Sequence, residues 1–433
     1  MKVLVIGSGA REHAIAWKLA ADRHVSEVVC TPGNPGIAAV ARLLPGVDPS
    51  PEALVAVARR EAVDLAVVGP EAPLAAGVAD RFREAGLRLL GPTRAAARLE
   101  TSKVFAKEFM RRHRVPTARY HVAETPEAAR AAIDDLGIPV VVKADGLAAG
   151  KGVVVAADRA AADRAVDAAM VARQFGDAGS RLVVEECLSG PEASFFVLCD
   201  GERAMVMGSA QDHKRAYDDD RGPNTGGMGA FAPSPLMTPA MEERVLREVV
   251  GPVLAGMRAE GAPYRGFLYV GLMLTADGPR VIEFNVRFGD PEAQVVLPSI
   301  ADDLAPLLAE AASGWLTVGR CRLVPQRHVG VVLASGGYPG AFETGKPVEG
   351  VDDAAALGGT LVFHAGTAQR DGRLVTAGGR VFTVVGRGHD FETAIERAYA
   401  AADRIRFDGL HLRRDIGQKA LAPPAPSAPR LYR

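Results

Sequence analysis

Short apolar runs and helical segments alternate through the first hundred residues. Continuous apolar runs that stop near a glycine or proline lie at residues 3–6, 28–30, 65–68 and 89–90. Such runs are typical of strands buried on both faces of a parallel sheet, and the segment 11–21 has a helical composition. The pattern predicts an open parallel α/β unit that binds its ligands at the carboxyl ends of its strands.

The pattern changes after residue 100. We expect one helix to start within 93–102 and to run on through Met110. A hairpin is expected from the segments 266–274 and 280–288. Residues 211–231 are charged, rich in glycine and proline and without periodicity, which predicts a long functional loop.

These changes divide the chain into four parts of an α/β and α+β multidomain fold. The predicted parts are an N-terminal open parallel α/β domain at 1–100, a two-lobed unit at 101–325 with a mobile flap subdomain at about 117–187, a small β-rich C-terminal domain at 326–419, and a disordered tail at 420–433. The tail contains four prolines, which favour an extended chain.

Composition and charge exclude several classes of protein. Of the 433 residues, 48% are hydrophobic and 24% charged, which is the range of ordinary globular proteins. The net charge is -1, from 51 Lys+Arg and 52 Asp+Glu, which argues against nucleic-acid and membrane partners. No apolar stretch approaches the ~20 residues that cross a bilayer. The four cysteines (Cys30, Cys187, Cys199, Cys321) have no zinc-like spacing and are expected to be buried and reduced in a cytoplasmic protein.

The turn after the first strand resembles a dinucleotide-binding fingerprint only in part. Glu12 replaces the third glycine of that motif, and no acidic residue closes the second strand, so a nicotinamide or flavin site is disfavoured. Two readings stay open. The turn can present Arg11 and backbone N–H groups to a phosphate, or it can be a packing turn without a ligand.

A second glycine-rich segment, KADGLAAGKG at 143–152, is flanked by two apolar runs. Its glycines permit close backbone approach and its lysines neutralise phosphate, so we expect a flap over a polyphosphate. The spacing is not that of a Walker A loop. The alternative is a hairpin with surface lysines, but Lys143 closes an apolar run, where a buried charge needs a partner.

The segment 281–288 is the most informative. With a period of two, Glu283, Asn285 and Arg287 share one face of the predicted strand. A carboxylate and an amide oxygen suit Mg²⁺, and the arginine suits a carboxylate or phosphate. An edge strand with a solvated polar face fits the same periodicity and remains the alternative.

Six motifs together resemble the ATP-grasp superfamily and, within it, the phosphoribosylamine–glycine ligase family. They are GSGAREH at 7–13, GPEAPL at 69–74, KADGLAAGKG at 143–152, QDHKR at 211–215, GPNTGGMG at 222–229 and EFNVRFGD at 283–290. The resemblance spans residues 1 to about 419. It implies an ATP-grasp fold and an ATP-dependent ligation of glycine to 5-phosphoribosylamine, through glycyl phosphate, in purine biosynthesis.

The resemblance also implies roles for particular residues. ATP would be contacted by Lys103, Lys143, Gly146, Gly150, Lys151, Gly152, Glu185, Glu186 and Glu192. The metal, Mg²⁺ or alternatively Mn²⁺, would be bound by Glu283 and Asn285. Reacting groups would be oriented or deprotonated by Arg287, Asp212, His213 and Lys214. The phosphoribosyl group would be held by Gly9, Arg11, Asn34 and Glu71. Glycine would be oriented by the 212–229 segment, with Asn224, Thr225, Gly226 and Gly227, and Asp290 would also contact a substrate.

Three other functions compete with this one. A related carboxylate–amine ligase would use another amino acid or amine. A nucleotide sensor would lack the catalytic charges, which are present here, and an oxidoreductase would bind NAD. As partners we expect only small molecules, with no nucleic acid and no membrane, and the chain as a monomer or weak dimer.

Overall fold

The first hundred residues form a five-stranded parallel sheet with helices on both faces. The computed structural model describes residues 1–146 and 152–421. The strand order is β3-β2-β1-β4-β5. The elements are β1 (Lys2–Gly7), α1 (Ala10–Ala20), β2 (Glu27–Pro32), β3 (Arg42–Leu43), α2 (Pro51–Arg60), β4 (Leu65–Val68), α3 (Glu71–Ala75), α4 (Val78–Glu84) and β5 (Leu89–Leu90). Alternate residues of β1 enter two different cores, so the parallel α/β prediction is confirmed.

The helix expected to start near residues 93–102 and to run through Met110 is α6 (Lys103–Arg112), and a second helix, α5 (Arg94–Thr101), precedes it. Ser102 between them has extended backbone angles, and its hydroxyl accepts a hydrogen bond from Phe105 N at 3.1 Å. A serine at this position caps the second helix and thereby ends the first. The predicted helix is confirmed, whereas α5 within the boundary segment was not predicted.

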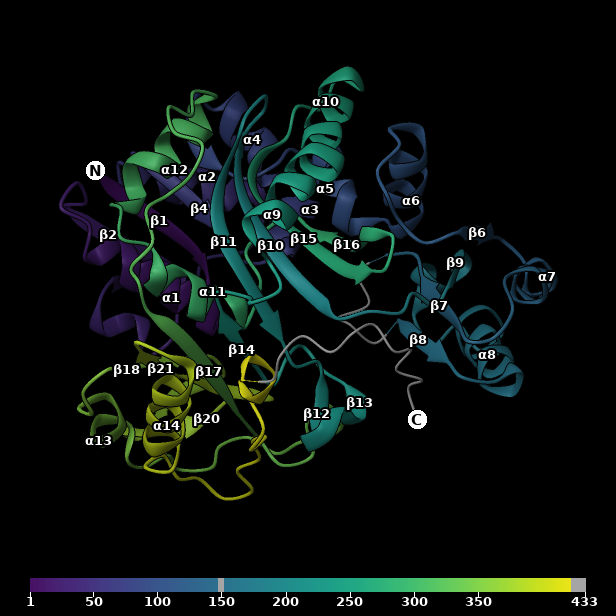
Figure 1. The fold of residues 1–433 in the computed structure, drawn as a ribbon. Coiled ribbons are helices and arrows are strands. Elements are labelled where there is room, and N and C mark those ends of the chain that lie inside the picture. The colour runs from purple at the N-terminus through teal and green to yellow at the C-terminus, as the bar shows by residue number, and fades with distance from the viewer. Residues whose placement is uncertain (147–151, 422–433) are drawn as a thin grey trace.

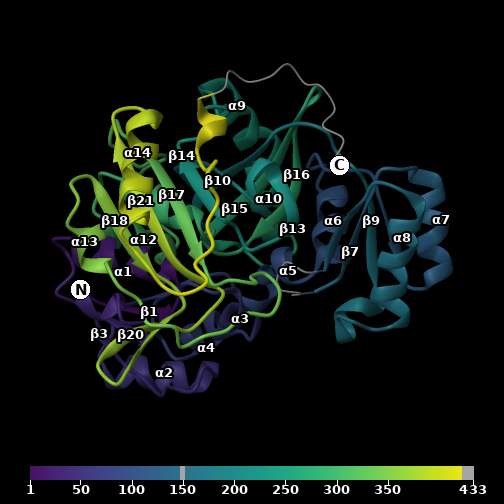
Figure 2. The ribbon, with the colours of Figure 1, turned by 90° about the horizontal axis from the view of Figure 1, so that it is seen from below.

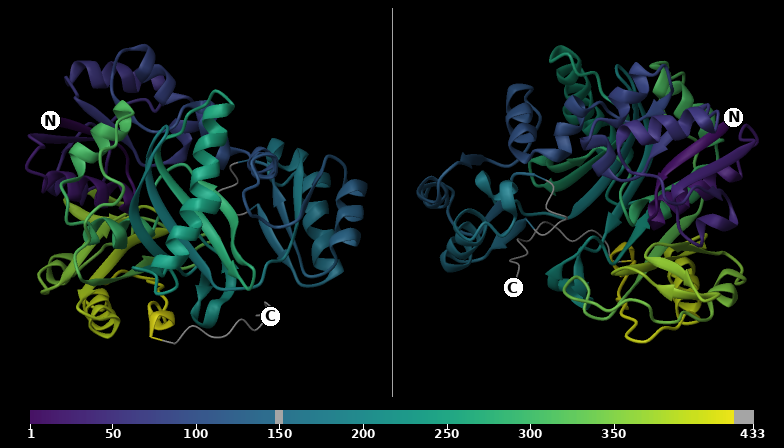
Figure 3. Two further views of the ribbon diagram at one scale, coloured as in Figure 1. Left: turned by 45° about the horizontal axis from the view of Figure 1, so that its top comes forward. Right: turned by 180° about the vertical axis from the view of Figure 1, so that it is seen from behind.

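A four-stranded antiparallel sheet forms a separate subdomain, at the right of Figure 1. It contains β6 (Tyr120–Ala123), α7 (Pro126–Leu136), β7 (Val140–Ala144), β8 (Val153–Ala156), α8 (Arg159–Val166) and β9 (Leu182–Glu186), in the order β6-β9-β7-β8. Helices α7 and α8 cover one face of this sheet (Figure 3), which leaves the other face for charged side chains.

An eight-stranded sheet spans the rest of the molecule, in the order β16-β15-β10-β11-β14-β17-β21-β18. Its strands are β10 (Glu192–Asp200), β11 (Ala204–Asp212), β14 (Gly229–Ala232), β15 (Arg265–Thr275), β16 (Gly278–Asn285), β17 (Arg327–Ala334), β18 (Thr360–His364) and β21 (Arg380–Gly388). Beside it lie α9 (Pro239–Val245), α10 (Gly251–Ala259), α11 (Glu292–Val296), α12 (Leu304–Ser313), α13 (Val351–Ala355) and α14 (Phe391–Ala402), with the small ribbon β19 (Thr367–Arg370) and β20 (Arg373–Thr376). The predicted hairpin is confirmed as β15–β16. Figure 2 shows α14 against β17 and β21.

The prediction of a long loop at 211–231 was largely wrong. Part of it forms the ribbon of β12 (Arg215–Tyr217) and β13 (Arg221–Asn224), and β14 lies between β11 and β17 in the large sheet. A Cβ at Gly229 would collide with Gly330 O of β17, so the glycine serves close strand packing. Because β14 is buried on both faces, it shows no polar alternation.

No helix of the described ranges 1–146 and 152–421 is long and apolar enough to span a membrane. Cys30, Cys199 and Cys321 are buried free thiols, as predicted, whereas Cys187 is only half-buried because it follows the end of β9. The predicted tail lies outside the described residues from position 422 onward.

Candidate active site

Lysine and glutamate side chains meet on the uncovered face of the four-stranded sheet. Val142 and Val184 pack into the helix-covered core, so their neighbours Lys143 and Glu185 point to the opposite face. The Lys143 Nζ–Glu185 Oε1 distance is 2.9 Å, and Lys107 Nζ of α6 lies 2.8 Å from Glu185 Oε2. Glu185 is thus the partner that a buried Lys143 requires.

In this cluster two ammonium groups share one carboxylate. Burial alone would raise the pKa of Glu185, but the ammonium groups of Lys143 and Lys107 more than offset it, so the pKa lies below its ordinary value. Burial lowers the pKa of Lys107 to about 8, against the effect of Glu185. The next side chain, Glu186, pairs with Arg119 at 2.9 Å. Glu185 and Glu186, both predicted to contact ATP, are therefore already in ion pairs.

The beginning of α6 meets the start of the glycine-rich segment. Asp145 Oδ1 accepts hydrogen bonds from Ser102 Oγ at 3.0 Å and from Val104 N at 3.2 Å. Lys103 Nζ donates to Gly146 O at 2.9 Å. A carboxylate at a helix N-terminus satisfies free N–H groups and interacts favourably with the helix dipole. This contact fixes Lys103 beside the segment that we predicted to cover polyphosphate.

The two ends of the glycine-rich segment are held together. Ala144 N donates to Gly152 O at 2.8 Å, across the base of the segment. Burial lowers the pKa of the neighbouring Lys103. The predicted nucleotide contacts Gly150 and Lys151 lie outside the described residues.

Acidic side chains predominate on the part of the eight-stranded sheet that faces the four-stranded sheet. Lys214 Nζ lies 3.0 Å from Glu192 Oε2 of β10 and 3.9 Å from Glu283 Oε1 of β16. Burial would raise the pKa of Glu283, but Lys214, Lys143 and Lys103 together lower it below its ordinary value. Because lysines from both sheets act on this one carboxylate, the structure brings the predicted phosphate and metal residues to one space.

A second pair of acids lies deeper in the large sheet. Burial raises the pKa of Asp212, and the carboxylate of Glu192 adds to the effect. Burial, with a contribution from Asp212, raises the pKa of Glu292 to about 7. Ser194 Oγ lies 3.0 Å from the Tyr269 hydroxyl and 3.5 Å from Glu292 Oε1. The Glu292 carboxyl group can therefore exchange a proton near neutral pH.

Arg287, just beyond β16, connects the large sheet to the first domain. Its Nη2 lies 3.0 Å from Glu100 Oε1 of α5, and its Nε lies 3.3 Å from Glu71 Oε2 of α3. Glu100 Oε2 also accepts a hydrogen bond from Val286 N at 2.7 Å. Glu71, predicted to hold a substrate, therefore lies directly beside the predicted catalytic arginine.

In the first turn of α1, the Glu12 carboxylate pairs with Arg11 and with a backbone N–H group. Gly9 N donates to Glu12 Oε2 at 2.5 Å, and Arg11 Nε lies 2.6 Å from Glu12 Oε1. A Cβ at Gly7 or Gly69 would collide with the Glu12 side chain. Glu12 therefore fills the turn in which a dinucleotide-binding protein would hold a pyrophosphate.

Asn34, predicted to bind the phosphoribosyl group, is occupied within the protein. Its Nδ2 donates to Ser8 O and His364 O, both at 2.8 Å, and its Oδ1 accepts from Ile37 N at 2.9 Å. The side chain thus fastens the β1–α1 turn to β18 at the other end of the sequence.

Arg380 of β21 holds the predicted glycine-binding segments together. Its Nη1 donates to Gly226 O and to Asp290 O, both at 2.7 Å, and its Nη2 lies 3.0 Å from Asp290 Oδ2. Gly226 N also donates to the Tyr338 hydroxyl at 2.9 Å. The guanidinium group thereby joins the 222–229 motif to the end of the 283–290 motif.

The remaining predicted residues lie next to this junction. Thr225 Oγ1 donates to Lys214 O at 2.9 Å and accepts from Gly227 N at 2.9 Å, while Asn224 pairs with β12. His213 is fully buried, neither ring nitrogen has a hydrogen-bond partner within the described part of the chain, and burial lowers its pKa to about 3. A histidine with this pKa is a weak base.

The comparisons with known proteins agree with this geometry. Sequence models of the N, ATP-grasp and C domains of phosphoribosylglycinamide synthetase match residues 1–100, 101–293 and 328–419. The chain belongs to the phosphoribosylglycinamide synthetase family. The phosphoribosylamine–glycine ligase of Xanthomonas axonopodis is 51% identical over 427 residues, which cover 98% of each chain. That of Ralstonia nicotianae is 49% identical over 422 residues, 97% of this chain and all of the other.

Solved structures also support the assignment of this chain to the phosphoribosylglycinamide synthetase family. The crystal structure of the Thermotoga maritima phosphoribosylamine–glycine ligase matches with a TM-score of 0.84 and 35% identity, covering 96% of this chain and 100% of that one. The biotin carboxylase domain of the Hydrogenobacter thermophilus 2-oxoglutarate carboxylase matches with a TM-score of 0.72 and 20% identity, covering 95% and 91%. The second likeness shows a shared fold, and the predicted multidomain ATP-grasp architecture is confirmed.

Sequence reasoning missed several residues of this site. Lys107 lies four residues after Lys103 on one helix, and this spacing was a usable signal, because such residues share a helix face. Glu292 follows a recognised motif by two residues. Glu100, Tyr269 and Arg380 carried no such signal, since each reaches the site from a segment without a motif.

Proposed function

We propose that this chain joins glycine to 5-phosphoribosylamine. The reaction consumes ATP and yields glycinamide ribonucleotide, ADP and phosphate, an early step of purine biosynthesis. The supporting observation is the position of the Glu283 carboxylate, which lies 3.9 Å from Lys214 Nζ, while Lys143 Nζ donates to the carbonyl of the preceding residue, Ile282, at 3.2 Å. The full-length relatives named phosphoribosylamine–glycine ligase support the choice of substrates.

ATP would lie between the two sheets. Lys103 and Lys143 would neutralise the phosphates. Near them, the ammonium groups of Lys107 and Lys143 share the single carboxylate of Glu185. Because the Glu185 and Glu186 carboxylates are already paired, the main chain of these two residues would contact adenine. Glu192 would hold the ribose, and the segment 145–152 would close over the phosphates.

Glu283 and Asn285 fit a divalent cation, which we propose to be Mg²⁺ or Mn²⁺. The lowered pKa keeps the Glu283 carboxylate ionised, and the Asn285 amide lies two residues away on the same edge strand, half-buried. Two hard oxygen donors that leave room for water and phosphate oxygens are typical of magnesium sites. When bound, the ion would supply charge neutralisation to the transferring phosphoryl group.

The chemistry needs alignment more than a covalent nucleophile. A glycine carboxylate oxygen attacks the γ-phosphorus, and the bond to the bridging oxygen of ADP breaks. The ribosylamine nitrogen then attacks the carbonyl carbon of glycyl phosphate, and phosphate leaves. Arg287 and Lys214 would orient the reacting groups, and positioning of this kind can offset roughly 7–11 kcal/mol of barrier. Asp212, whose pKa is raised by burial, is better placed than His213 to accept the amine proton.

The two small substrates would enter from different sides. Asp290 and the backbone of 224–227, joined by Arg380, would hold glycine. Gly9, Arg11, Asn34 and Glu71 would form the phosphoribosyl site, with Asn34 positioning the β1–α1 turn through its hydrogen bonds to Ser8 O and His364 O. The 3.3 Å contact between Glu71 and Arg287 supports this arrangement, since it places the first domain's crevice against the reaction centre.

We also propose that the protein is cytoplasmic, acts as a monomer or weak dimer, and has neither nucleic-acid nor membrane partners. The near-neutral net charge of -1 and the four free cysteines support this. Light scattering at several protein concentrations measures the oligomeric state, and a stable tetramer would contradict it.

The decisive experiment follows ADP release from purified protein with Mg-ATP and glycine, with and without freshly made phosphoribosylamine. We expect release to require both glycine and the amine. The same assay with alanine or serine in place of glycine tests the alternative, because ADP release with one of these amino acids and none with glycine would indicate a related carboxylate–amine ligase. Full turnover without the amine, or indifference to glycine, contradicts the proposal.

A further inference from the structure

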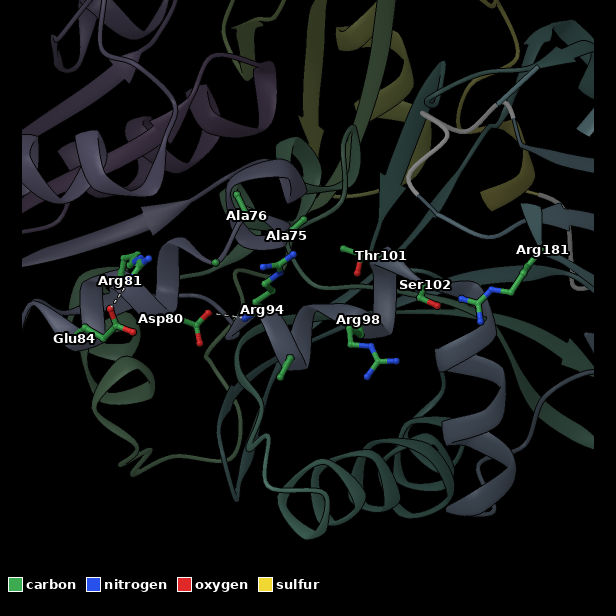
Figure 4. Close-up of a pocket in the computed structure, with 12 residues that line it drawn as sticks. Ala75, Ala76, Asp80, Arg81, Glu84, Arg94, Arg98, Thr101, Ser102 and Arg181 are labelled. Atoms are coloured by element: carbon green, nitrogen blue, oxygen red, sulfur yellow. Dashed lines mark hydrogen bonds and ion pairs between the residues drawn. The ribbon is translucent and has the colours of Figure 1, made fainter. Parts of the chain in front are cut away.

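A wide cleft lies between the first domain and the four-stranded subdomain, and none of the residues that line it is assigned above to a substrate (Figure 4). Its volume is about 1000 Å³, at the upper end of small-molecule sites. Helices α3, α4 and α5 line it, with the start of β9 opposite. The charged lining residues are Arg81, Arg94, Arg98, Arg181, Asp80 and Glu84.

Both acids of the cleft are engaged. Glu84 lies 2.8 Å from Arg81 Nη1, one helical turn away, and Asp80 Oδ2 accepts a hydrogen bond from Arg94 N at 2.7 Å. The Asp80 carboxylate is thus held at the first turn of α5, where it satisfies a free N–H group. Neither acid forms an ion pair with the guanidinium group of Arg94.

Two arginines of α5 therefore keep unneutralised charges. The Arg94 guanidinium has neither a hydrogen bond nor an ion pair within residues 1–146 and 152–421, and in Figure 4 it points towards Ala75, which also lines the cleft. The guanidinium carbon of Arg98 lies 4.1 Å from the centre of the Phe105 ring, a contact that orients the group and leaves its N–H donors available. Donors of this kind suit phosphoryl oxygens in fork geometry.

The third arginine connects the cleft to the candidate active site. Arg181 Nη2 lies 2.6 Å from Asp145 Oδ2. The other oxygen of Asp145 accepts the hydrogen bonds from Ser102 and Val104 at the start of α6. An anion in the cleft would compete with Asp145 for Arg181 and so alter the electrostatic balance beside Lys103.

We propose that this cleft binds a small molecule with a diphosphate group, through Arg94, Arg98 and Arg181. The bound ligand draws Arg181 away from Asp145, and this exchange couples the cleft to the glycine-rich segment. By reciprocity, a change that weakens the Arg181–Asp145 pair strengthens diphosphate binding. The inference does not depend on the ligase reaction, because binding is measured without turnover.

Calorimetric titration tests the site directly. Protein saturated with glycine and the magnesium complex of a non-hydrolysable ATP analogue is titrated with pyrophosphate and, separately, with ADP. We expect one further molecule to bind per chain. Equal affinities indicate that the diphosphate group suffices, and tighter binding of ADP identifies a nucleoside diphosphate as the ligand. Absence of a further binding event overturns the proposal.

Charge-reversal variants locate the site. Arg94→Glu combined with Arg98→Glu is expected to weaken the added binding more than tenfold. Arg83→Glu on α4 reverses one charge outside the cleft lining, half the charge change of the double variant, and as a control is expected to leave binding within twofold. Asp145→Asn is expected to strengthen pyrophosphate binding several-fold. Equal losses in the double variant and the control, or no gain with Asp145→Asn, would contradict the assignment.

Discussion

The two sheets that flank the candidate active site have opposite charge balances. On the four-stranded sheet, Lys143 and the α6 residue Lys107 share the single carboxylate of Glu185. On the eight-stranded sheet, Lys214 lies between Glu192 and Glu283. The first surface is matched to phosphate and the second to a cation, which is the pairing that a metal–nucleotide complex requires.

The two clusters also differ in their dependence on burial. Lys107, Lys143 and Glu185 are almost fully buried, so their ion pairs belong to the folded core of the subdomain. The side chains of Lys214 and Glu283 are about a third or more exposed, at 34% and 41%. We therefore expect loss of the Glu185 carboxylate to lower stability most, and changes at Lys214 or Glu283 to lower activity with little effect on stability.

The largest expected effect concerns the buried cluster. Glu185→Ala leaves two buried ammonium groups without their carboxylate, and the unfolding free energy should fall by about 3–5 kcal/mol, the usual cost of breaking a buried ion pair. Urea unfolding measures it. The neighbouring variant Glu186→Ala, which removes a more exposed pair with Arg119, should cost less than about 1 kcal/mol. Similar losses in both variants would abolish the distinction between the clusters.

The exposed cluster should behave in the opposite way. Glu283→Ala is expected to lower kcat/KM by about 10²-fold, close to 3 kcal/mol of transition-state stabilisation, with an unchanged urea midpoint. Initial rates across a series of magnesium concentrations measure the effect, and the loss should be greatest at limiting magnesium. Near-normal turnover under those conditions would refute the metal assignment.

Glu292 tests the comparison of the two sheets further, because it is a buried acid beside the eight-stranded sheet. Its folded pKa of about 7 exceeds the ordinary value of 4.5, so the folded state binds the proton more tightly. Its contribution to stability is full below pH 4.5 and is lost as the pH rises through 7, by up to about 3 kcal/mol. Glu292→Gln should remove this part of the pH dependence. Unfolding curves in EDTA from pH 4.5 to 8 test it, and identical profiles for the variant and the wild type would exclude it.

The smallest effect tests the contribution of β21 to the acid-rich side. Arg380→Lys cannot reach Gly226 O and both Asp290 oxygens at once, so the KM for glycine should rise roughly tenfold, about 1.4 kcal/mol, with little change in KM for ATP. Steady-state kinetics separate the two constants. An equal rise in both would show a general structural loss instead.

Much of the fold could be predicted from local patterns. The β1–α1 turn and the β15–β16 hairpin depend on contacts between neighbours in sequence, so periodicity located them. The prediction of a loop at 211–231 failed because β14 is a strand only by virtue of its pairing with β11 and β17 on either side, which no local pattern reveals.

The amino-acid sequence by itself determined which side chains carry charge and which of them alternate with apolar neighbours, as Lys143 and Glu283 do, because a strand's period of two requires only local geometry. Tertiary structure alone decided which charges meet. Glu185 acquires Lys107 from α6, and Asp290 acquires Arg380 from a strand ninety positions later. Pairing between distant segments follows from the packing of whole sheets, which no single segment encodes.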